Sequence, residues 1–222
     1  MRATITLGAL GAIALAGAAQ ATPFQGFSFD SMGNMGDGET IRMYVDLDAG
    51  SRIDAVFGNS VGDLSIQVNG GSFFQHALGG PTSTAINSAF FPLAPSLEWD
   101  SYVTIGALYA DGTPFGNNAL LDIGISWASF EGGGELATDN GSWFVTPVDA
   151  QGEEQGGRVL IGQFTVIGGT GDGYTDLLGQ ISIQGKDADG VTFQELGATW
   201  VPAPGAIALL GLAGVCGRRR RK

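Results

Sequence analysis

Apolar and polar side chains alternate along several short segments of this chain. One such apolar face contains Leu121, Ile123, Ile125 and Trp127. A period of two residues indicates a β-strand with one buried face. We therefore predict strands at residues 41–48, 63–69, 102–109, 121–127 and 177–184. Residues 158–167 are apolar on both faces, which predicts a central strand.

Glycine-rich turns separate these segments. Glycine accounts for 38 of the 222 residues, and clusters such as those at residues 69–71 and 132–134 allow the chain to reverse. Short strands joined by such turns predict an all-β fold, an antiparallel β-sandwich that forms one domain over residues 22–200. Residues 73–95 are the least strand-like part. We expect them to form a long excursion that crosses an edge or an end of the sandwich.

The first 21 residues have the features of a secretory signal peptide. Arg2 supplies a positive charge, and residues 5–18 are uncharged and mostly apolar. Ala19 and Ala21 form the small-x-small site that a signal peptidase requires. We predict an N-terminal signal helix, residues 1–21, that is cleaved before Thr22. A buried N-terminal helix is the alternative.

The last 22 residues, 201–222, also differ from the body. Residues 203–217 are uncharged and mostly apolar, and as a helix they would measure about 22 Å against a hydrocarbon core of about 30 Å. We expect a short transmembrane helix that inserts only marginally. A basic cluster follows, formed by Arg218, Arg219, Arg220, Arg221 and Lys222. These cations would stay in the cytoplasm and leave the body outside.

This tail resembles a PEP-CTERM sorting signal, which combines a proline pair, a short transmembrane stretch and a terminal arginine cluster. The proline motif is matched by Val201, Pro202, Ala203 and Pro204. Ala203 stands where the family usually has Glu. The resemblance implies processing by an exosortase-type transpeptidase in a bacterium that builds extracellular polysaccharide. The protein would be anchored transiently in the inner membrane and then reach the cell surface or extracellular matrix. An ordinary anchor that is never cut is the alternative.

The body is similar to uncharacterised planctomycete-type surface proteins with the same tail. The similar stretches are residues 44–48, 56–58, 96–103 and 141–147. Their strand pattern is broadly similar to cohesin-like or immunoglobulin-like/jelly-roll sandwiches. This resemblance implies a non-catalytic interaction domain and carries no site residues.

Charge narrows the range of partners. The whole chain has a formal charge of −12, but six of its ten basic residues lie in the two ends. All 22 acidic residues lie between Asp30 and Glu195, with only four basic residues among them, so the body has a charge of about −18. The four are Arg42, Arg52, Arg158 and Lys186. A nucleic-acid partner is excluded because such binding depends on cations that replace counterions at phosphates.

Catalytic chemistry has few residues to use. The chain has one histidine, His76, and one cysteine, Cys216, which lies in the tail. Catalysis by a Cys/His pair and a histidine-based zinc site are therefore not expected. Glu98 and Asp100 flank Trp99. On a strand the two carboxylates would share a face about 6–7 Å apart, which keeps a secreted glycan hydrolase as the alternative function. The favoured interpretation is that the protein is not an enzyme.

Two binding chemistries stay open. Oxygen ligands in glycine-rich loops favour calcium as a candidate cofactor, with Asp172, Asp176, Asp187 and Asp189 as its ligands. These residues also form turns without any ion. Exposed aromatic side chains would line a glycan platform; the candidates are Trp99, Trp127, Trp143 and Trp200. We therefore expect a structural or adhesive, glycan-binding protein of the envelope or matrix, with extracellular polysaccharide as a candidate partner.

Overall fold

The computed structural model describes residues 22–35, 38–169 and 173–200. Three predicted features lie outside the described residues: the signal segment 1–21, the tail 201–222 and Asp172. What the sequence indicates for them stays a prediction. In the described ranges, no helix has the length and apolar character needed to cross a membrane.

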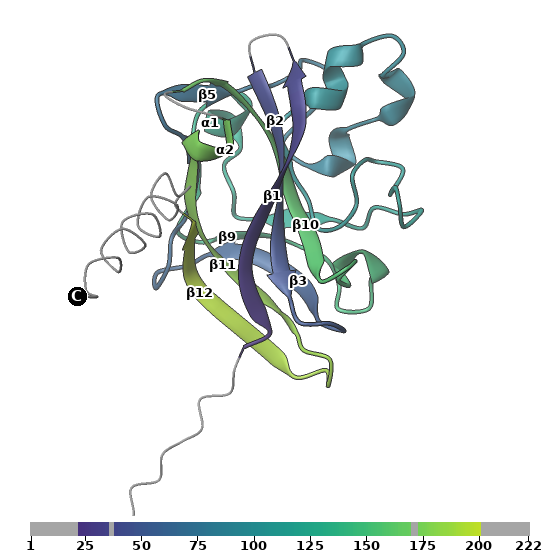
Figure 1. The fold of residues 1–222 in the computed structure, drawn as a ribbon, viewed down its shortest axis with the longest axis vertical. Helices are drawn as coiled ribbons and strands as arrows, with labels where there is room; N and C mark the ends of the chain where they lie inside the picture. Colours follow the sequence, from purple (N-terminus) through teal and green to yellow (C-terminus); the bar gives the residue numbers. More distant parts are fainter. Residues whose placement is uncertain (1–21, 36–37, 170–172, 201–222) are drawn as a thin grey trace, which may run out of the picture.

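Two antiparallel sheets make up the body (Figure 1). In order across the first sheet lie β1 (Phe24–Met35), β2 (Gly38–Leu47), β10 (Arg158–Gly168) and β5 (Gly71–Phe73), and β6 (Tyr102–Val103) also pairs with β10. The second sheet runs β7 (Leu121–Ile123), β9 (Gly141–Phe144), β3 (Arg52–Gly58), β11 (Leu177–Lys186), β4 (Leu64–Val68) and β8 (Leu136–Thr138), with β12 (Thr192–Trp200) beside β11. The all-β prediction is confirmed.

Short helices occupy the connections. They are the 3-10 turns η1 (Ser83–Ala85), η2 (Ser88–Phe90), η3 (Pro95–Trp99) and η4 (Ala150–Gly152), and the one-turn α-helices α1 (Ala128–Glu131) and α2 (Gly173–Asp176). Two of the 3-10 turns, η1 and η2, lie in the stretch predicted to be irregular, and η3 begins at its last residue. That prediction is confirmed for residues 74–95, while Phe73 itself ends β5.

One hydrophobic core joins the two sheets. Met43 and Val45 of β2 and Ile53 and Val56 of β3 belong to the same buried cluster, and all four are fully buried. Burial of each such side chain contributes about 1.5–3 kcal/mol relative to exposure. Alternate residues of β2 therefore point into the core, and Arg42 and its outward neighbours point away from it.

Four of the predicted strands are confirmed. Residues 41–48, 63–69 and 177–184 correspond to β2, β4 and β11. Residues 158–167 form β10, which is buried along most of its length and pairs with β2 on one side and with β5 and β6 on the other. Its continuous apolar sequence reflects cover on both faces.

Two predicted strands are wrong over most of their length. Within residues 102–109 only β6 is a strand, because the chain turns at Gly106, whose φ is +70°. Within residues 121–127 only β7 is a strand, and Leu121 and Ile123 are 52% and 66% exposed. Period-two alternation predicts a buried face only where a second layer covers it, and β7 is an edge strand without such cover.

The excursion after β5 runs along an edge of the first sheet, where Thr82 bridges to Val103 of β6, and it also covers part of the outer face of that sheet. Gln163 of β10 donates from its side chain to the Asp100 carbonyl over 3.1 Å, and the Thr165 hydroxyl donates to the Trp99 carbonyl over 2.5 Å. The excursion also has a small core of its own, formed by Ile86, Leu97 and Tyr102 with Phe91, Ala94 and Tyr109 against it. It lies at the upper right in Figure 1.

Candidate functional site

A row of polar and aromatic side chains lies on the outer face of the first sheet. Arg42 and Tyr44 are alternate residues of β2, and both are half-buried. Asp30 pairs in register with Arg42 from β1, and Leu160 pairs with Tyr44 from β10. Because alternate residues of a strand share a face, these side chains gather on one surface.

A cleft forms where the chain folds back over this row. Its floor is the outer face of β2 and β10, and the opposite walls come from the loop after β6 and from the segment before β10. The residues that line it are Arg42, Tyr44, Gly106, Leu108, Pro114, Phe115, Glu153, Gln155, Arg158, Val159 and Leu160. Its volume is about 140 Å³. Sites for drug-sized ligands span about 300–1,000 Å³, so this cleft suits one small chemical group.

Gln151 and Gly106 hold the loop wall in place. The buried Gln151 side chain donates to the Ile105 carbonyl and accepts from the Ala119 amide, each over 2.8 Å. A Cβ at Gly106 would lie 1.9 Å from the Gln151 carbonyl oxygen, so no larger residue fits there. The wall is therefore fixed by hydrogen bonds to η4, far away in sequence.

Arg158 is a cation in the cleft whose charge is paired with Asp30. Its guanidinium donates to both carboxylate oxygens of Asp30, over 3.0 and 2.6 Å, and lies 3.9 Å from the centre of the Tyr44 ring. Hydrogen bonding to Arg158 lowers the pKa of Asp30 below its ordinary value. Burial raises the pKa of Tyr44, so this hydroxyl stays neutral at physiological pH.

The hydrogen-bond partners of Arg42 are neutral, although its charge also acts on the nearby Asp30 carboxylate. Its Nε donates to the Gln163 side-chain oxygen over 3.1 Å, and the Tyr109 hydroxyl interacts with the same guanidinium while burial raises the Tyr109 pKa. Within the described ranges no carboxylate lies within 4.0 Å of Arg42. A guanidinium has five N–H donors, so Arg42 keeps donors for a ligand in the cleft.

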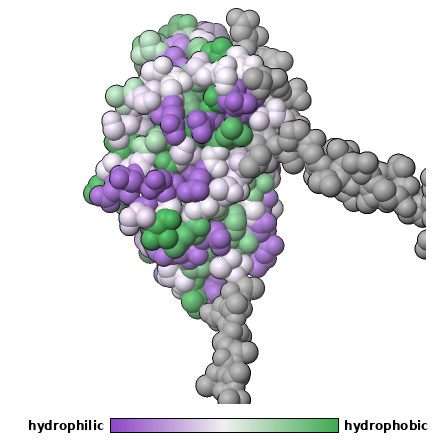
Figure 2. Space-filling view, turned by 90° about the vertical axis from the view of Figure 1, so that its left-hand side faces the viewer, coloured by the Kyte–Doolittle hydropathy of each residue, from purple (hydrophilic) through white to green (hydrophobic). Residues whose placement is uncertain are grey.

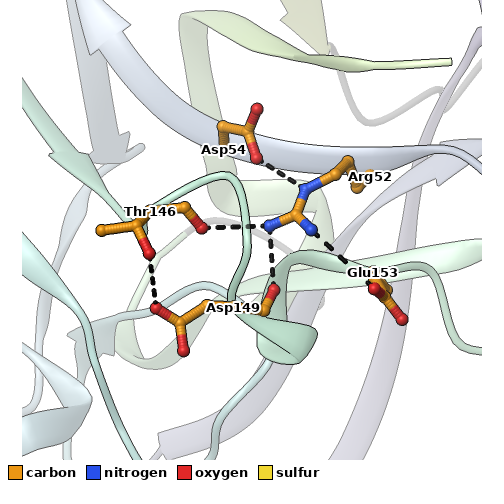
Figure 3. A network of polar contacts seen from close by, with 5 residues as sticks. All are labelled: Arg52, Asp54, Thr146, Asp149 and Glu153. Atoms are coloured by element: carbon orange, nitrogen blue, oxygen red, sulfur yellow. Dashed lines mark hydrogen bonds and ion pairs between the residues drawn. The ribbon is translucent and has the colours of Figure 1, made fainter. Parts of the chain in front are cut away.

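Arg52 contrasts with Arg42, because it is buried and forms an ion pair with the buried Asp54 (Figure 3). Its Nε donates to Asp54 over 2.7 Å, and Nη2 donates to the carbonyls of Asp149 and Thr146 over 2.8 and 3.2 Å. Glu153 lies 3.9 Å from Nη1. A charge satisfied in this way is structural. It ties β3 to the segment that supplies the cleft residues Glu153 and Gln155.

The expected carboxylate pair does not form on a strand, so that prediction is wrong. Glu98 belongs to η3, and Asp100 caps the end of this turn. The Asp100 side chain is fully buried and accepts the backbone N–H groups of His76, Gly80 and Ser101 over 2.7, 3.1 and 3.1 Å. Burial raises the pKa of Asp100 to about 6. Asp100 closes the loop that contains His76 and has no room for a substrate.

Asp176 and Asp187, two of the candidate calcium ligands, lie far apart. Asp176 is buried at the start of β11, while Asp187 follows the other end of this strand. At about 3.3 Å per residue they are on the order of 35 Å apart, so one ion cannot bind both. Asp187 accepts the amides of Asp189 and Val191 over 3.0 and 2.8 Å, which makes it a turn former. The described residues contain no group of three metal-ligating side chains.

The four tryptophans do not form a platform either. Trp143 and Trp200 are buried, and their indole N–H groups donate to the carbonyls of Thr104 and Leu177 over 3.0 and 2.9 Å. Trp127 is half-buried against the core and donates to Asp122. Trp99 is half-buried in η3. These side chains lie on separate elements, and Trp143 and Trp200 pack in the core, which is the alternative to a platform.

The cleft residues were missed by sequence reasoning. Arg42 and Tyr44 alternate on a predicted strand, and their outward direction could have been read from that pattern. Phe115 and Leu108 could not be predicted from the sequence pattern, because tertiary contacts bring their loop over β2 and β10. These include the hydrogen bonds of Gln151 and the backbone bond from Gly106 to Leu160.

The chain matches no protein-family model, no curated protein and no solved structure. Functional inference therefore depends on the cleft and on the sequence signals at the two ends.

Proposed function

We propose that this chain is an exported, non-catalytic protein of the bacterial cell envelope or extracellular matrix, which binds an extracellular glycan in the cleft of the first sheet. The observation that carries the proposal is Arg42, a half-buried guanidinium with neutral partners at the edge of a small, partly apolar cleft. Such a site pairs an apolar wall with a few convergent polar groups, as small-ligand sites do.

The cleft walls suit a sugar unit. Phe115, Leu108 and Pro114 present apolar surface against which the C–H face of a pyranose ring can pack. Arg42, Gln155 and Arg158 supply polar atoms at the same cleft. Binding without turnover is favoured because the acid pair required by the hydrolase alternative is disrupted by the burial of Asp100.

Export and sorting belong to the same proposal. Signal peptidase would cut after Ala21, and an exosortase-type transpeptidase would act at residues 201–204 while the basic cluster holds the tail in the inner membrane. The buried Trp200 immediately precedes that motif. The body would therefore lie close to the membrane until the tail is cut.

The finer fold description is also a proposal. Two antiparallel sheets with a shared core support a β-sandwich of the cohesin-like or immunoglobulin-like/jelly-roll kind. Such folds host many binding functions, so the fold by itself does not identify a ligand.

A glycan array tests the binding proposal. The full chain, purified in mild detergent, is applied beside Phe115→Ala and a matched control, Phe90→Ala, whose ring is exposed on η2. We expect glycan binding that Phe115→Ala weakens at least about tenfold and Phe90→Ala leaves intact. Binding that survives Phe115→Ala would place the site elsewhere, and hydrolysis of a bound glycan would contradict the non-catalytic assignment.

A further inference from the structure

We infer that the cleft recognises a single carboxylate on its ligand, through Arg42, and that the ligand is a saccharide unit bearing one negative charge. This inference depends on the proposed function and names its ligand class. A guanidinium pairs with a carboxylate or a phosphate through two parallel N–H···O bonds, which are among the strong hydrogen bonds of proteins.

The first step is that Arg42 is left without a carboxylate by its own neighbours. Asp30 is its cross-strand partner in the register of β1 and β2, yet the Asp30 carboxylate gives both oxygens to Arg158. The partner that strand pairing would provide is therefore occupied. Among the described residues Arg42 forms no ion pair within 4.0 Å, and it acts on the Asp30 carboxylate only at longer range.

The second step is that Arg42 is held in position before any ligand arrives. The Gln163 side-chain nitrogen donates to the carbonyls of Glu98 and Asp100 over 2.9 and 3.1 Å. This fixes the amide so that its oxygen faces Arg42 and accepts from Nε. A guanidinium positioned in this way loses less conformational entropy on binding.

The third step concerns the number of charges on the ligand. The body has 22 acidic residues and four basic ones, so a polyanion would be repelled as its charge grows. Screening limits that repulsion to about 8 Å at physiological ionic strength. One carboxylate placed at Arg42 gains a local ion pair, and a cleft of about 140 Å³ suits the charged group of a single unit.

Matched monosaccharides test this inference. Methyl glucuronide and methyl glucoside differ at one carbon, which carries a carboxylate in the first and a hydroxymethyl group in the second. Both, with acetate as a carboxylate without a ring, are titrated into the full chain and binding is followed by backbone amide NMR shifts. The variants are Arg42→Gln and Lys186→Gln, which removes the same charge from β11 in the other sheet.

The expected result is that glucuronide binds at least about tenfold more tightly than glucoside or acetate. Arg42→Gln should remove this preference, and Lys186→Gln should keep it. Should Arg42→Gln fail to fold, Arg42→Lys keeps the charge without the planar fork and should reduce the preference severalfold.

Other outcomes separate this inference from the proposed function. Equal binding of glucuronide and glucoside, or a preference that both variants lose, would overturn the carboxylate inference and leave glycan binding intact. If acetate bound as tightly as methyl glucuronide, the inference that the ligand is a saccharide would be overturned. Glycan-array binding that survives Arg42→Gln unchanged would also overturn the inference, whereas an empty array would contradict the proposed function itself.

Discussion

Asp30 and Arg158 form a bidentate ion pair although strand β2 lies between their strands. The guanidinium passes over the Tyr44 ring, 3.9 Å from its centre, to reach the carboxylate on the far strand. The pair is about one-third exposed, so its contribution to stability is small. Its consequence for the proposed site is that Asp30 is engaged by Arg158, while Arg42 forms no ion pair within 4.0 Å among the described residues.

Asp30→Asn should therefore change binding more than stability. Loss of the carboxylate frees Arg158 and removes a negative charge beside Arg42, so affinity for methyl glucuronide should rise severalfold. The free energy of unfolding should fall by no more than about 1 kcal/mol. Titration followed by NMR and urea unfolding would measure the two effects. Asp63→Asn, on a remote loop, is the control; an equal rise in that variant would assign the effect to net charge alone.

Arg52 should be far more important for stability than Arg42. Arg52→Met leaves Asp54 buried without its cation, which should cost about 3–5 kcal/mol in the free energy of unfolding, measured by urea denaturation. The double variant Arg52→Met/Asp54→Leu should recover part of this loss because no unpaired charge remains. A loss of less than 1 kcal/mol in the single variant would contradict the structural role of the network.

Asp100 predicts a pH-dependent stability. Burial raises its folded-state pKa from 3.8 to about 6, so the folded protein binds a proton more readily than the unfolded chain does. The stability that Asp100 contributes is fully present below about pH 3.8 and is lost as pH rises to about 6, by on the order of 3 kcal/mol. Asp100→Asn cannot titrate. The difference in unfolding free energy between wild type and this variant should therefore shrink from pH 4 to pH 7, and a constant difference would contradict the assignment.

The sorting proposal predicts a processing defect. Replacement of Pro202 and Pro204 by Ala should leave the chain uncut in the inner membrane, while wild type loses its tail. Fractionation and intact-mass measurement in the native host would detect both forms. Val201→Ala serves as a mild control in the same segment. Normal processing of the double variant would refute the sorting role of the proline pair.

The sequence was most informative where burial and periodicity agree. β2 and β10 were predictable because alternation in one and continuous apolarity in the other reflect how many faces are covered. β7 was not, since Leu121 and Ile123 alternate in the same way yet lie at an uncovered edge. A pattern reports which residues share a face, and not whether a second layer exists.

The candidate site was less predictable than the fold. Arg42 and Tyr44 were readable as outward neighbours, but the pairing of Asp30 with Arg158 depends on strand order, which periodicity does not determine. The cleft wall depends on Gln151, whose two hydrogen bonds connect segments more than 30 residues away. Asp100 was expected beside a substrate and is instead buried by contacts with the loop at residues 76–80.

The most direct test of the central claim is a map of where envelope polysaccharide touches the protein. The full chain, labelled for backbone amide NMR, is titrated with soluble polysaccharide from its own host. Shifts should concentrate at residues 42–44, 106–115 and 153–160, which surround the cleft. Shifts confined to other surfaces, such as the groove lined by Asp63, Glu135 and Asp139, would contradict the claim that the Arg42 cleft is the binding site.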